Sequence, residues 1–322
     1  MPSDKKASAL FRIPVWRCVE TQEQLPGILQ GYFGIQRCNC NATFSPEMNP
    51  SDALPGVQPY RVHFEYTTPP PHPGSSWTRW VCISDTHGHT FTVPDGDVLV
   101  HAGDLTSWGK MNSLDSTIQW IKGLPHRTKI LVAGNHDELL DSKLFEDGLN
   151  NIEATEDDLA RAADLVKGPE ALSSGIHYLE YESYEFQAKP GGRTWKVYGS
   201  PGSPQYSGGG FRYFQGKEAD AINARIPADI DVLITHTPPE GTLDTLRNGS
   251  THAGCGSLAI RVSRPDFTRC RLHVFGHIHE ARGVTTVPVN CGEEIERVCA
   301  NAAKSHRRAD QPPVIVDLLD DI

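Results

Sequence analysis

Two histidines, His277 and His279, close the segment RLHVFGHIHEARG, in which a hydrophobic run from Leu272 to Phe275 ends in a glycine. Such a run is typical of a buried strand that leads into a loop. Imidazole is the commonest metal ligand in proteins, but one His-x-His pair also fits a surface loop or a hydrogen-bonded core. The interpretation therefore depends on which residues follow the other hydrophobic runs.

Four other hydrophobic runs also end in residue types that bind metals or transfer protons. These runs lead into VCISDTHGHT, LVHAGDLT, ILVAGNHDE and VLITHTPPE. The polar residues at their ends are Asp85, His87, Asp104, Asn135, His136, Asp137 and His236. Carboxylates and imidazoles gathered on one sheet rim would repel each other or stay unpaired unless cations lay between them. The pattern therefore predicts a metal site at the carboxyl ends of the strands, where ligand sites of open α/β sheets form.

The elements that position these residues alternate along the chain from Trp77 onward. Runs with strand character are WVCIS, DVLVHA, KILVAG, WKVYGS, DVLITH, LHVFGH and PVIVDL. Helical spacing of apolar residues occurs in MNSLDSTIQWIKGL, TEDDLARAADLVKG and GKEADAINARI. This interleaving favours an α/β fold with sheets inside and helices outside.

Residues 1–75 differ from the rest of the chain. They contain few strong strand patterns, the turn-rich segment SPEMNPSDALPG and the proline-rich segment TTPPPHPGSS. We interpret residues 1–75 as an N-terminal extension of unknown role that ends in a stiff linker, and residues 76–322 as the functional domain.

Composition excludes several classes of partner. The net charge of −10 over 322 residues argues against a nucleic-acid polymer, because such binding depends on basic surface. The sequence has no signal-peptide pattern and no long apolar run, so we expect no membrane association and a cytoplasmic location. The eight cysteines are expected to be mostly free thiols, and Cys38 and Cys40 lack a second pair at zinc-finger spacing.

The order Asp-x-His, Gly-Asp, Gly-Asn-His-Asp, His and Gly-His-x-His resembles the calcineurin-like metallophosphoesterase superfamily. The spacing and flanks are most similar to its metallophosphoesterase-domain-containing branch, which is known in animals for cyclic-nucleotide phosphodiesterase activity. The resemblance covers about residues 77–322, including the late run QPPVIVDL. It implies a four-layer α-β-β-α sandwich, in which two mixed sheets are flanked by helices.

The resemblance also implies a pair of divalent metal ions. It assigns one ion to Asp85, His87 and His279, the second ion to Asn135, His236 and His277, and a bridging position to Asp104. A donor set of nitrogen and oxygen atoms without thiolates suits Mn²⁺, Fe or Zn²⁺, and we expect Mn²⁺. Some animal relatives have glycine at the position of His277, so the histidine in this chain favours two filled sites.

His136 has a different implied role. In the superfamily, the corresponding histidine binds no metal and contacts the scissile phosphate or its leaving oxygen, and the following acid, here Asp137, orients the ring. The alternative is a hydrogen bond from His136 to a metal ligand, which outer groups of metal sites commonly provide.

These assignments lead to a functional hypothesis. We expect a two-metal phosphoesterase that hydrolyses small organic phosphates, and specifically a phosphodiesterase for cyclic nucleotides or similar diesters, with a hydroxide between the metals as the nucleophile. One alternative is a phosphomonoesterase or protein phosphatase with the same dinuclear site. Another is a metal-binding scaffold with weak catalysis, although all seven ligands and His136 are present.

Substrate contacts are less determined by the sequence. The segment SPGSPQYSGGGFRYF corresponds to a tryptophan-rich pocket segment of relatives but is poorer in indole, and Tyr206, Phe211 and Arg212 are candidate pocket walls. The glycine-rich loop NGSTHAGCGSLA offers His252 and Ser257 near a phosphate, although its spacing is not that of a P-loop. We expect a small phosphorylated substrate, with His252 and Arg212 among its contacts.

Overall fold

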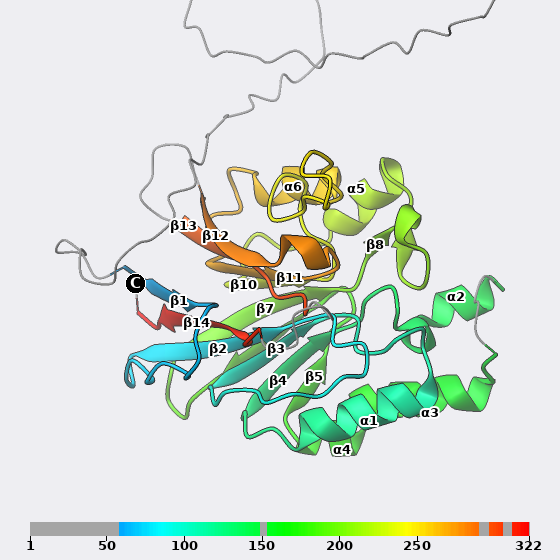
Figure 1. Ribbon diagram of the computed structural model, residues 1–322, viewed down its shortest axis with the longest axis horizontal. Helices are drawn as coiled ribbons and strands as arrows, with labels where there is room; N and C mark the ends of the chain where they lie inside the picture. Colours follow the sequence, from blue (N-terminus) through cyan, green and yellow to red (C-terminus); the bar gives the residue numbers. More distant parts are fainter. Residues whose placement is uncertain (1–57, 149–152, 290–295, 305–310, 322) are drawn as a thin grey trace, which may run out of the picture. The chain divides into compact units, whose positions relative to one another are not determined.

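Two six-stranded sheets face each other in the computed structural model, which describes residues 58–148, 153–289, 296–304 and 311–321 (Figure 1). The first sheet has the order β1 (Tyr60–His63), β14 (Val314–Leu319), β2 (Trp77–Ile83), β3 (Val98–Ala102), β4 (Thr128–Val132) and β5 (Ile176–Tyr178). Strands β2 to β5 are parallel, whereas β14 runs antiparallel to both β2 and β1. The first sheet is therefore mixed.

The second sheet is also mixed. Its order is β12 (Gly283–Pro288), β13 (Glu296–Asn301), β11 (Leu272–Phe275), β10 (Val232–Thr235), β7 (Thr194–Ser200) and β6 (Glu182–Gln187). The four central strands are parallel and the two edge strands antiparallel. A separate parallel pair is formed by β8 (Ser203–Pro204) and β9 (Arg212–Tyr213).

Helices cover the outer face of each sheet (Figure 1). The first sheet packs against α1 (Met111–Lys122), α3 (Glu156–Lys167) and α4 (Pro169–Ser173), and the second against α5 (Lys217–Asn223) and α6 (Gly256–Val262). A further short helix is α2 (Ser142–Glu146), and 3-10 turns η1, η2 and η3 span Glu138–Leu140, Gln205–Ser207 and His279–Ala281. The expected four-layer α-β-β-α sandwich is confirmed. Within the described ranges, no helix is long and apolar enough to cross a membrane.

The central strands are continuously apolar because both of their faces are buried. In β2, Trp80 and Cys82 lie in the core between the sheets, while Val81 and Ile83 pack with the core under the helices. Buried parallel strands have this composition, since neither face contacts water. The runs that identified these strands in the sequence are therefore explained by the layer order.

The structure places β1 inside the range 1–75 that the sequence assigns to an extension. β1 is an edge strand that pairs with β14, and its four residues, YRVH, are too few to give a clear strand pattern. The guanidinium of Arg79 donates to the carbonyl oxygens of Pro70 and Pro71 at 2.7 and 3.0 Å. The proline-rich segment is thus bound to the sheet and is not a free linker. Residues 1–57, with the Cys-x-Cys motif, lie outside the described residues.

Candidate metal centre

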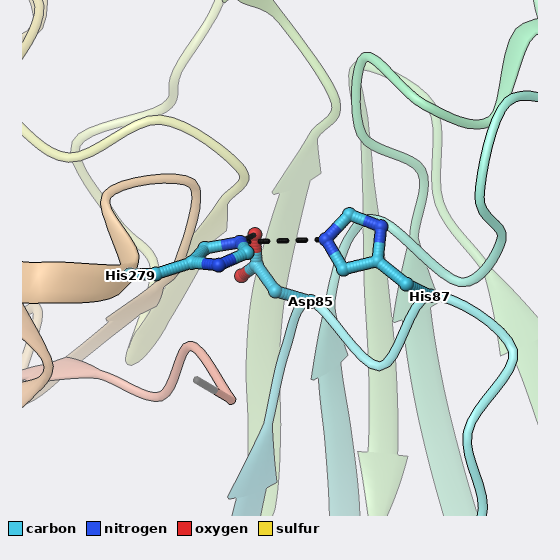
Figure 2. A group of neighbouring side chains, drawn as sticks. All are labelled: Asp85, His87 and His279. Atoms are coloured by element: carbon cyan, nitrogen blue, oxygen red, sulfur yellow. Dashed lines mark hydrogen bonds and ion pairs between the residues drawn. The ribbon is translucent and has the colours of Figure 1, made fainter. Parts of the chain in front are cut away.

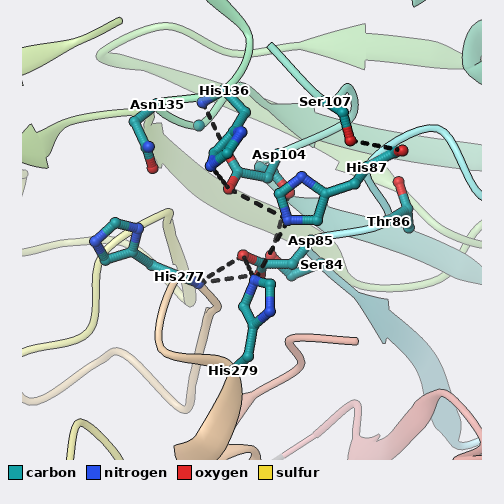
Figure 3. Close-up of polar contacts among 12 residues, drawn as sticks. Ser84, Asp85, Thr86, His87, Asp104, Ser107, Asn135, His136, His277 and His279 are labelled. Atoms are coloured by element: carbon teal, nitrogen blue, oxygen red, sulfur yellow. Dashed lines mark hydrogen bonds and ion pairs between the residues drawn. The ribbon is translucent and has the colours of Figure 1, made fainter. Parts of the chain in front are cut away.

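The predicted polar residues lie together where five parallel strands end. β2, β3 and β4 of the first sheet and β10 and β11 of the second lead into the loops that carry them. Figure 3 shows side chains from both sheets pointing toward one another across this edge. The structure brings together Asp85, His87, Asp104, Asn135, His136, Asp137, His236, His277 and His279.

Four of these residues have a backbone conformation that non-glycine residues rarely adopt. The φ angles of Asp85, His87, Asp104 and His277 are 56°, 47°, 55° and 66°. Left-handed conformations of this kind cost free energy and persist where the surrounding structure determines them. Backbone strain from positive φ angles is therefore found at four residues of the cluster.

The glycine that precedes the ligand in three motifs is required by close approach. A Cβ atom on Gly103 would lie 2.4 Å from Nδ1 of His236, and one on Gly134 would lie 2.3 Å from Oδ1 of Asp104. A Cβ atom on Gly276 would lie 2.0 Å from Oδ2 of Asp85. Only glycine therefore lets the neighbouring loops approach one another closely enough for their side chains to converge.

Asp85, His87 and His279 form a first group of side chains that could hold a metal ion (Figure 2). The Nε2 atom of His279 lies 3.0 Å from Oδ1 of Asp85 and 3.3 Å from Nε2 of His87. The Nδ1 atom of His87 lies 3.1 Å from the carbonyl oxygen of Thr106. A proton on Nδ1 leaves the Nε2 lone pair directed into the group, which is the arrangement of a metal-binding histidine.

Asn135, His236 and His277 form the second group. The Nε2 atom of His236 lies 3.1 Å from Oδ1 of Asn135 and 3.2 Å from Nδ1 of His277. The Nδ1 atom of His236 lies 2.9 Å from the carbonyl oxygen of Ala102, which orients its other nitrogen toward the group. A single proton on Nε2 cannot serve both contacts, whereas a cation between the three donor atoms can.

Asp104 lies between the two groups with one carboxylate oxygen toward each. Its Oδ1 atom lies 3.4 Å from Nε2 of His236, and its Oδ2 atom lies 3.8 Å from Nε2 of His87. The backbone N–H of His136 donates to Oδ1 at 2.9 Å and fixes the carboxylate. The side chain therefore fits a bridging position between two cations, and the donor set fits divalent metals that accept nitrogen and oxygen.

The charges of the cluster are balanced by imidazoles. No Lys or Arg in the described part of the chain forms a recorded hydrogen bond or ion pair with Asp85 or Asp104. Although burial opposes ionisation, His236 lowers the pKa of Asp104 to about 2. Burial lowers the pKa of His236, but the charges of Asp104 and Asp85 outweigh it and raise that pKa to about 9. Divalent ions would replace this proton.

His136 borders both the cluster and solvent. Its Nε2 atom lies 3.9 Å from Oδ2 of Asp104, and the side chain is 20% exposed. Its Nδ1 atom is buried and has no hydrogen-bond partner among the residues that the structure describes. His136 also forms a possible ligand group with His87 and Asp104, so its position suits either a metal contact or a substrate contact.

The expectation that Asp137 orients the ring of His136 is wrong. The carboxylate of Asp137 accepts hydrogen bonds from the backbone N–H groups of Leu105, Thr106 and Gly134 at 3.0, 2.8 and 2.9 Å. It also accepts one from the Thr106 hydroxyl at 2.9 Å. Both carboxylate oxygens are thus engaged by these four donors, and within the described residues none of the hydrogen bonds of Asp137 goes to the ring of His136. Asp137 therefore joins the loop after β3 to the loop after β4, which positions the ligands that both loops carry.

Of the two expected substrate residues, His252 lies in the loop before α6 and Arg212 lies in β9. The Nδ1 atom of His252 lies 2.7 Å from Oδ1 of the buried Asp244, and the side chain of His252 is 49% exposed. The neighbouring Ala253 accepts a hydrogen bond from the hydroxyl of Tyr206, whose ring centroid lies 6.3 Å from that of His277. Arg212 lies in β9 opposite Ser203, and no recorded contact joins its side chain to the cluster in the described ranges. His252 thus lies on a loop beside the cluster, and Arg212 remains a prediction.

Two residues of the loop after β3 were missed by the sequence analysis. Thr106 binds the His87 ring through its carbonyl oxygen and the His136 carbonyl oxygen through its hydroxyl. The ring of Trp108 lies against that of His136, at 4.1 Å between centroids. The sequence signal that could have identified Trp108 is an aromatic residue directly before a glycine, four residues after the predicted ligand Asp104.

Comparison with known proteins gives one family and several relatives. The family model for calcineurin-like phosphoesterase matches residues 78–281, which include every residue of the two ligand groups. Metallophosphoesterase domain-containing protein 1 of Homo sapiens and that of Mus musculus are each 33% identical over 279 residues, covering 80% of this chain and 76% of the relative. The UPF0046 protein C25E10.12 of Caenorhabditis elegans is 37% identical over 218 residues, covering 65% of this chain and 71% of the relative.

Proposed function

We propose that this chain acts as a phosphodiesterase on small organic phosphates such as cyclic nucleotides. The chain belongs to the calcineurin-like phosphoesterase family and is a metal-dependent phosphoesterase. The observation that carries the proposal is the position of Asp104 between two convergent donor groups. Bound there, two divalent ions would supply an activated water as nucleophile and positive charge for the phosphate oxygens. We propose Mn²⁺ for both positions, with Fe or Zn²⁺ as the alternatives that the same seven nitrogen and oxygen donors suit.

The residues of the chain divide this work. Asp85, His87 and His279 would hold one ion and Asn135, His236 and His277 the other, with Asp104 shared. His236 and His87 are fixed by the carbonyl oxygens of Ala102 and Thr106, so their metal-binding nitrogens are directed before any ligand arrives. Such preorganisation avoids rearrangement of the site during the reaction.

We assign proton transfer to the leaving oxygen to His136. Its Nε2 atom lies 3.9 Å from Oδ2 of Asp104, and its side chain reaches solvent. Its backbone is fixed at both the N–H, which donates to Asp104, and the carbonyl oxygen, which accepts from Thr106. An alkoxide leaving group, such as a ribose oxygen, needs a proton as its bond to phosphorus breaks. His252, held through Nδ1 by Asp244, is proposed to contact the phosphate or the sugar with its other nitrogen.

A cytoplasmic location is part of the proposal. Within the described ranges, Cys82, Cys255, Cys270 and Cys299 are all free thiols and all buried. Reduced cysteines of this kind are usual in compartments where glutathione and thioredoxin keep thiols reduced.

The same ligands would serve a phosphomonoesterase, so substrate preference is the critical test. The Mn²⁺-loaded protein is assayed on bis(p-nitrophenyl) phosphate and on p-nitrophenyl phosphate, followed by 2′,3′- and 3′,5′-cyclic nucleotides. We expect kcat/KM for the diester to exceed that for the monoester by about tenfold or more. A preference for the monoester would contradict the proposal and support the phosphatase alternative. Fewer than one bound metal ion per chain, with no turnover of either ester, would support the scaffold alternative.

A further inference from the structure

We propose that Trp108 is the surface on which the flat base of a nucleotide substrate stacks beside the leaving oxygen. The inference rests on the proposed function. It adds a residue that selects substrates by the group attached to the leaving oxygen. It begins from a large apolar side chain that the fold leaves in water next to the reacting centre.

The side chain of Trp108 is 54% exposed and yet contacts His136. The two ring centroids are 4.1 Å apart, with an angle of 47° between the planes. Among the described residues, Trp108 belongs neither to the core between the sheets nor to the core under the helices of either sheet, so it does not hold the layers together. Among the described residues, the exposed large hydrophobic side chains are Trp108, Leu172, Tyr206, Phe214 and Ile260. Trp108 and Tyr206 have recorded ring contacts with histidines of the site.

The backbone holds Trp108 in this position at a cost. Its φ angle is 60°, a left-handed conformation that a bulky residue rarely adopts. The next residue, Gly109, donates from its N–H to the carbonyl oxygen of His136 at 2.8 Å. The hydroxyl of Ser107 donates to the carbonyl oxygen of His87 at 3.1 Å (Figure 3). Both neighbours of Trp108 are therefore tied to residues of the cluster, and the strained position is maintained by the site itself.

The position defines what Trp108 can bind. His136 is the residue assigned to the leaving oxygen, so a group attached to that oxygen extends past His136 toward the indole. An exposed indole face binds a flat π system by stacking, and stacking on an aromatic side chain strengthens binding of a base by about ten- to hundredfold. The sugar-linked base of a nucleotide has the required planar shape, whereas a sugar phosphate without a base does not.

The test compares two inhibitors that share ribose and phosphate. Inhibition constants are measured for adenosine 5′-monophosphate and for ribose 5-phosphate, with bis(p-nitrophenyl) phosphate as the substrate. The protein is the Mn²⁺-loaded full chain, and the KM of each variant is determined separately. Trp108→Leu keeps an apolar side chain without an aromatic face, and Trp108→Phe keeps a smaller face. Leu172→Ala is the matched control, because Leu172 is 53% exposed and lies in α4 of the helical layer.

We expect Trp108→Leu to raise the inhibition constant of the nucleotide by about tenfold or more and to leave that of ribose 5-phosphate within about twofold. Trp108→Phe should give a smaller increase for the nucleotide, and Leu172→Ala should change neither constant. An equal increase for both inhibitors would overturn the proposal, because it would mean that Trp108 acts only by positioning His136. Unchanged constants for both would overturn it as well.

The two hypotheses can fail separately. If the wild-type chain does not hydrolyse the diester, the proposed function fails, and equilibrium dialysis of the two inhibitors still measures the contribution of Trp108. If the wild-type chain hydrolyses the diester and the variants do not discriminate between the inhibitors, only the role of Trp108 fails. Metal content and the thermal unfolding midpoint of each variant confirm that the comparison concerns folded, loaded protein.

Discussion

The two ends of the parallel strands hold buried carboxylates in opposite ways. At the amino ends, Asp317 receives two hydrogen bonds from the guanidinium of Arg79, at 2.7 and 2.9 Å. Asp231, which is fully buried, forms ion pairs with Arg193 and Arg269 at 2.6 and 3.0 Å. Each of these carboxylates has a guanidinium of the same chain as its counter-ion.

At the carboxyl ends the chain supplies no such partner within the described ranges. Asp85 and Asp104 face imidazoles, and imidazole nitrogens face one another at 3.2 and 3.3 Å. Buried charges without fixed partners are expensive, so they are retained where they bind something. The comparison teaches that burial of charge alone does not identify a site. The absence of a Lys or Arg counter-ion among the described residues distinguishes the candidate metal centre from the structural ion pairs.

The largest expected effect comes from the bridging carboxylate. Asp104→Asn keeps the shape of the side chain but removes the charge that offsets repulsion between two cations. We expect diester hydrolysis to fall by about 10⁴-fold, since metal ions supply several kcal/mol of transition-state stabilisation. Metal content per chain should fall in the same preparation. Near-normal turnover of this variant would contradict the assignment of Asp104 to a bridge.

The second prediction distinguishes His136 from the ligands around it. If His136 protonates the leaving oxygen, His136→Ala should slow hydrolysis of a cyclic nucleotide by about 10²- to 10⁴-fold. The loss should be much smaller on bis(p-nitrophenyl) phosphate, because p-nitrophenolate departs without a proton. Both metal ions should stay bound. Equal losses on the two substrates would favour simple phosphate binding, and loss of metal would place His136 among the ligands.

Removing a buried carboxylate at the amino ends of the parallel strands should lower the stability of the fold and leave metal binding unchanged. Asp317→Asn leaves the guanidinium of Arg79, 4% exposed, without its counter-ion. We expect the free energy of unfolding to fall by about 3–5 kcal/mol, as is typical when one partner of a buried pair is removed. Denaturant unfolding measures the change, and metal content is the control. If this variant lost metal while its stability stayed normal, the distinction between the two ends would be wrong.

The smallest effect concerns protons at the metal centre. With a pKa of about 9, His236 carries a proton at neutral pH in the metal-free protein. This imidazolium stabilises the metal-free fold below the ordinary histidine pKa, and its contribution is lost as the pH rises through about 9. Metal must displace the proton, so apparent affinity should rise by up to about tenfold per pH unit in the neutral range. Calorimetry in buffers of different ionisation enthalpy should detect proton release, and pH-independent affinity would contradict it.

Much of the site could be predicted because its chemistry restricts residue types. Carboxylates and imidazoles have no reason to follow five buried strands unless they bind something, so the motifs after β2, β3, β4, β10 and β11 indicated that these strands end in one cluster. The four-layer fold followed from the same runs together with the resemblance. The glycines of the motifs gained their explanation only from the structure, since the short distance between Gly134 and Asp104 depends on how two loops meet.

Other features depend on long-range contacts that sequence patterns do not encode. β1 is recognisable only through its pairing with β14, about 250 residues later in the chain. Asp137 follows a catalytic-type motif, yet its carboxylate is directed by backbone N–H groups from two different loops. Trp108 is a single aromatic residue in a polar loop, and its importance follows from the position of His136 beyond β4.

Anomalous diffraction from crystals of the full chain grown with Mn²⁺ would locate the bound metal ions directly. We expect two peaks about 3.5–4 Å apart, as in known two-metal sites. One peak should lie beside Asp85, His87 and His279, the other beside Asn135, His236 and His277, and Asp104 should lie between them. A single peak, or two peaks that do not share Asp104, would contradict the account.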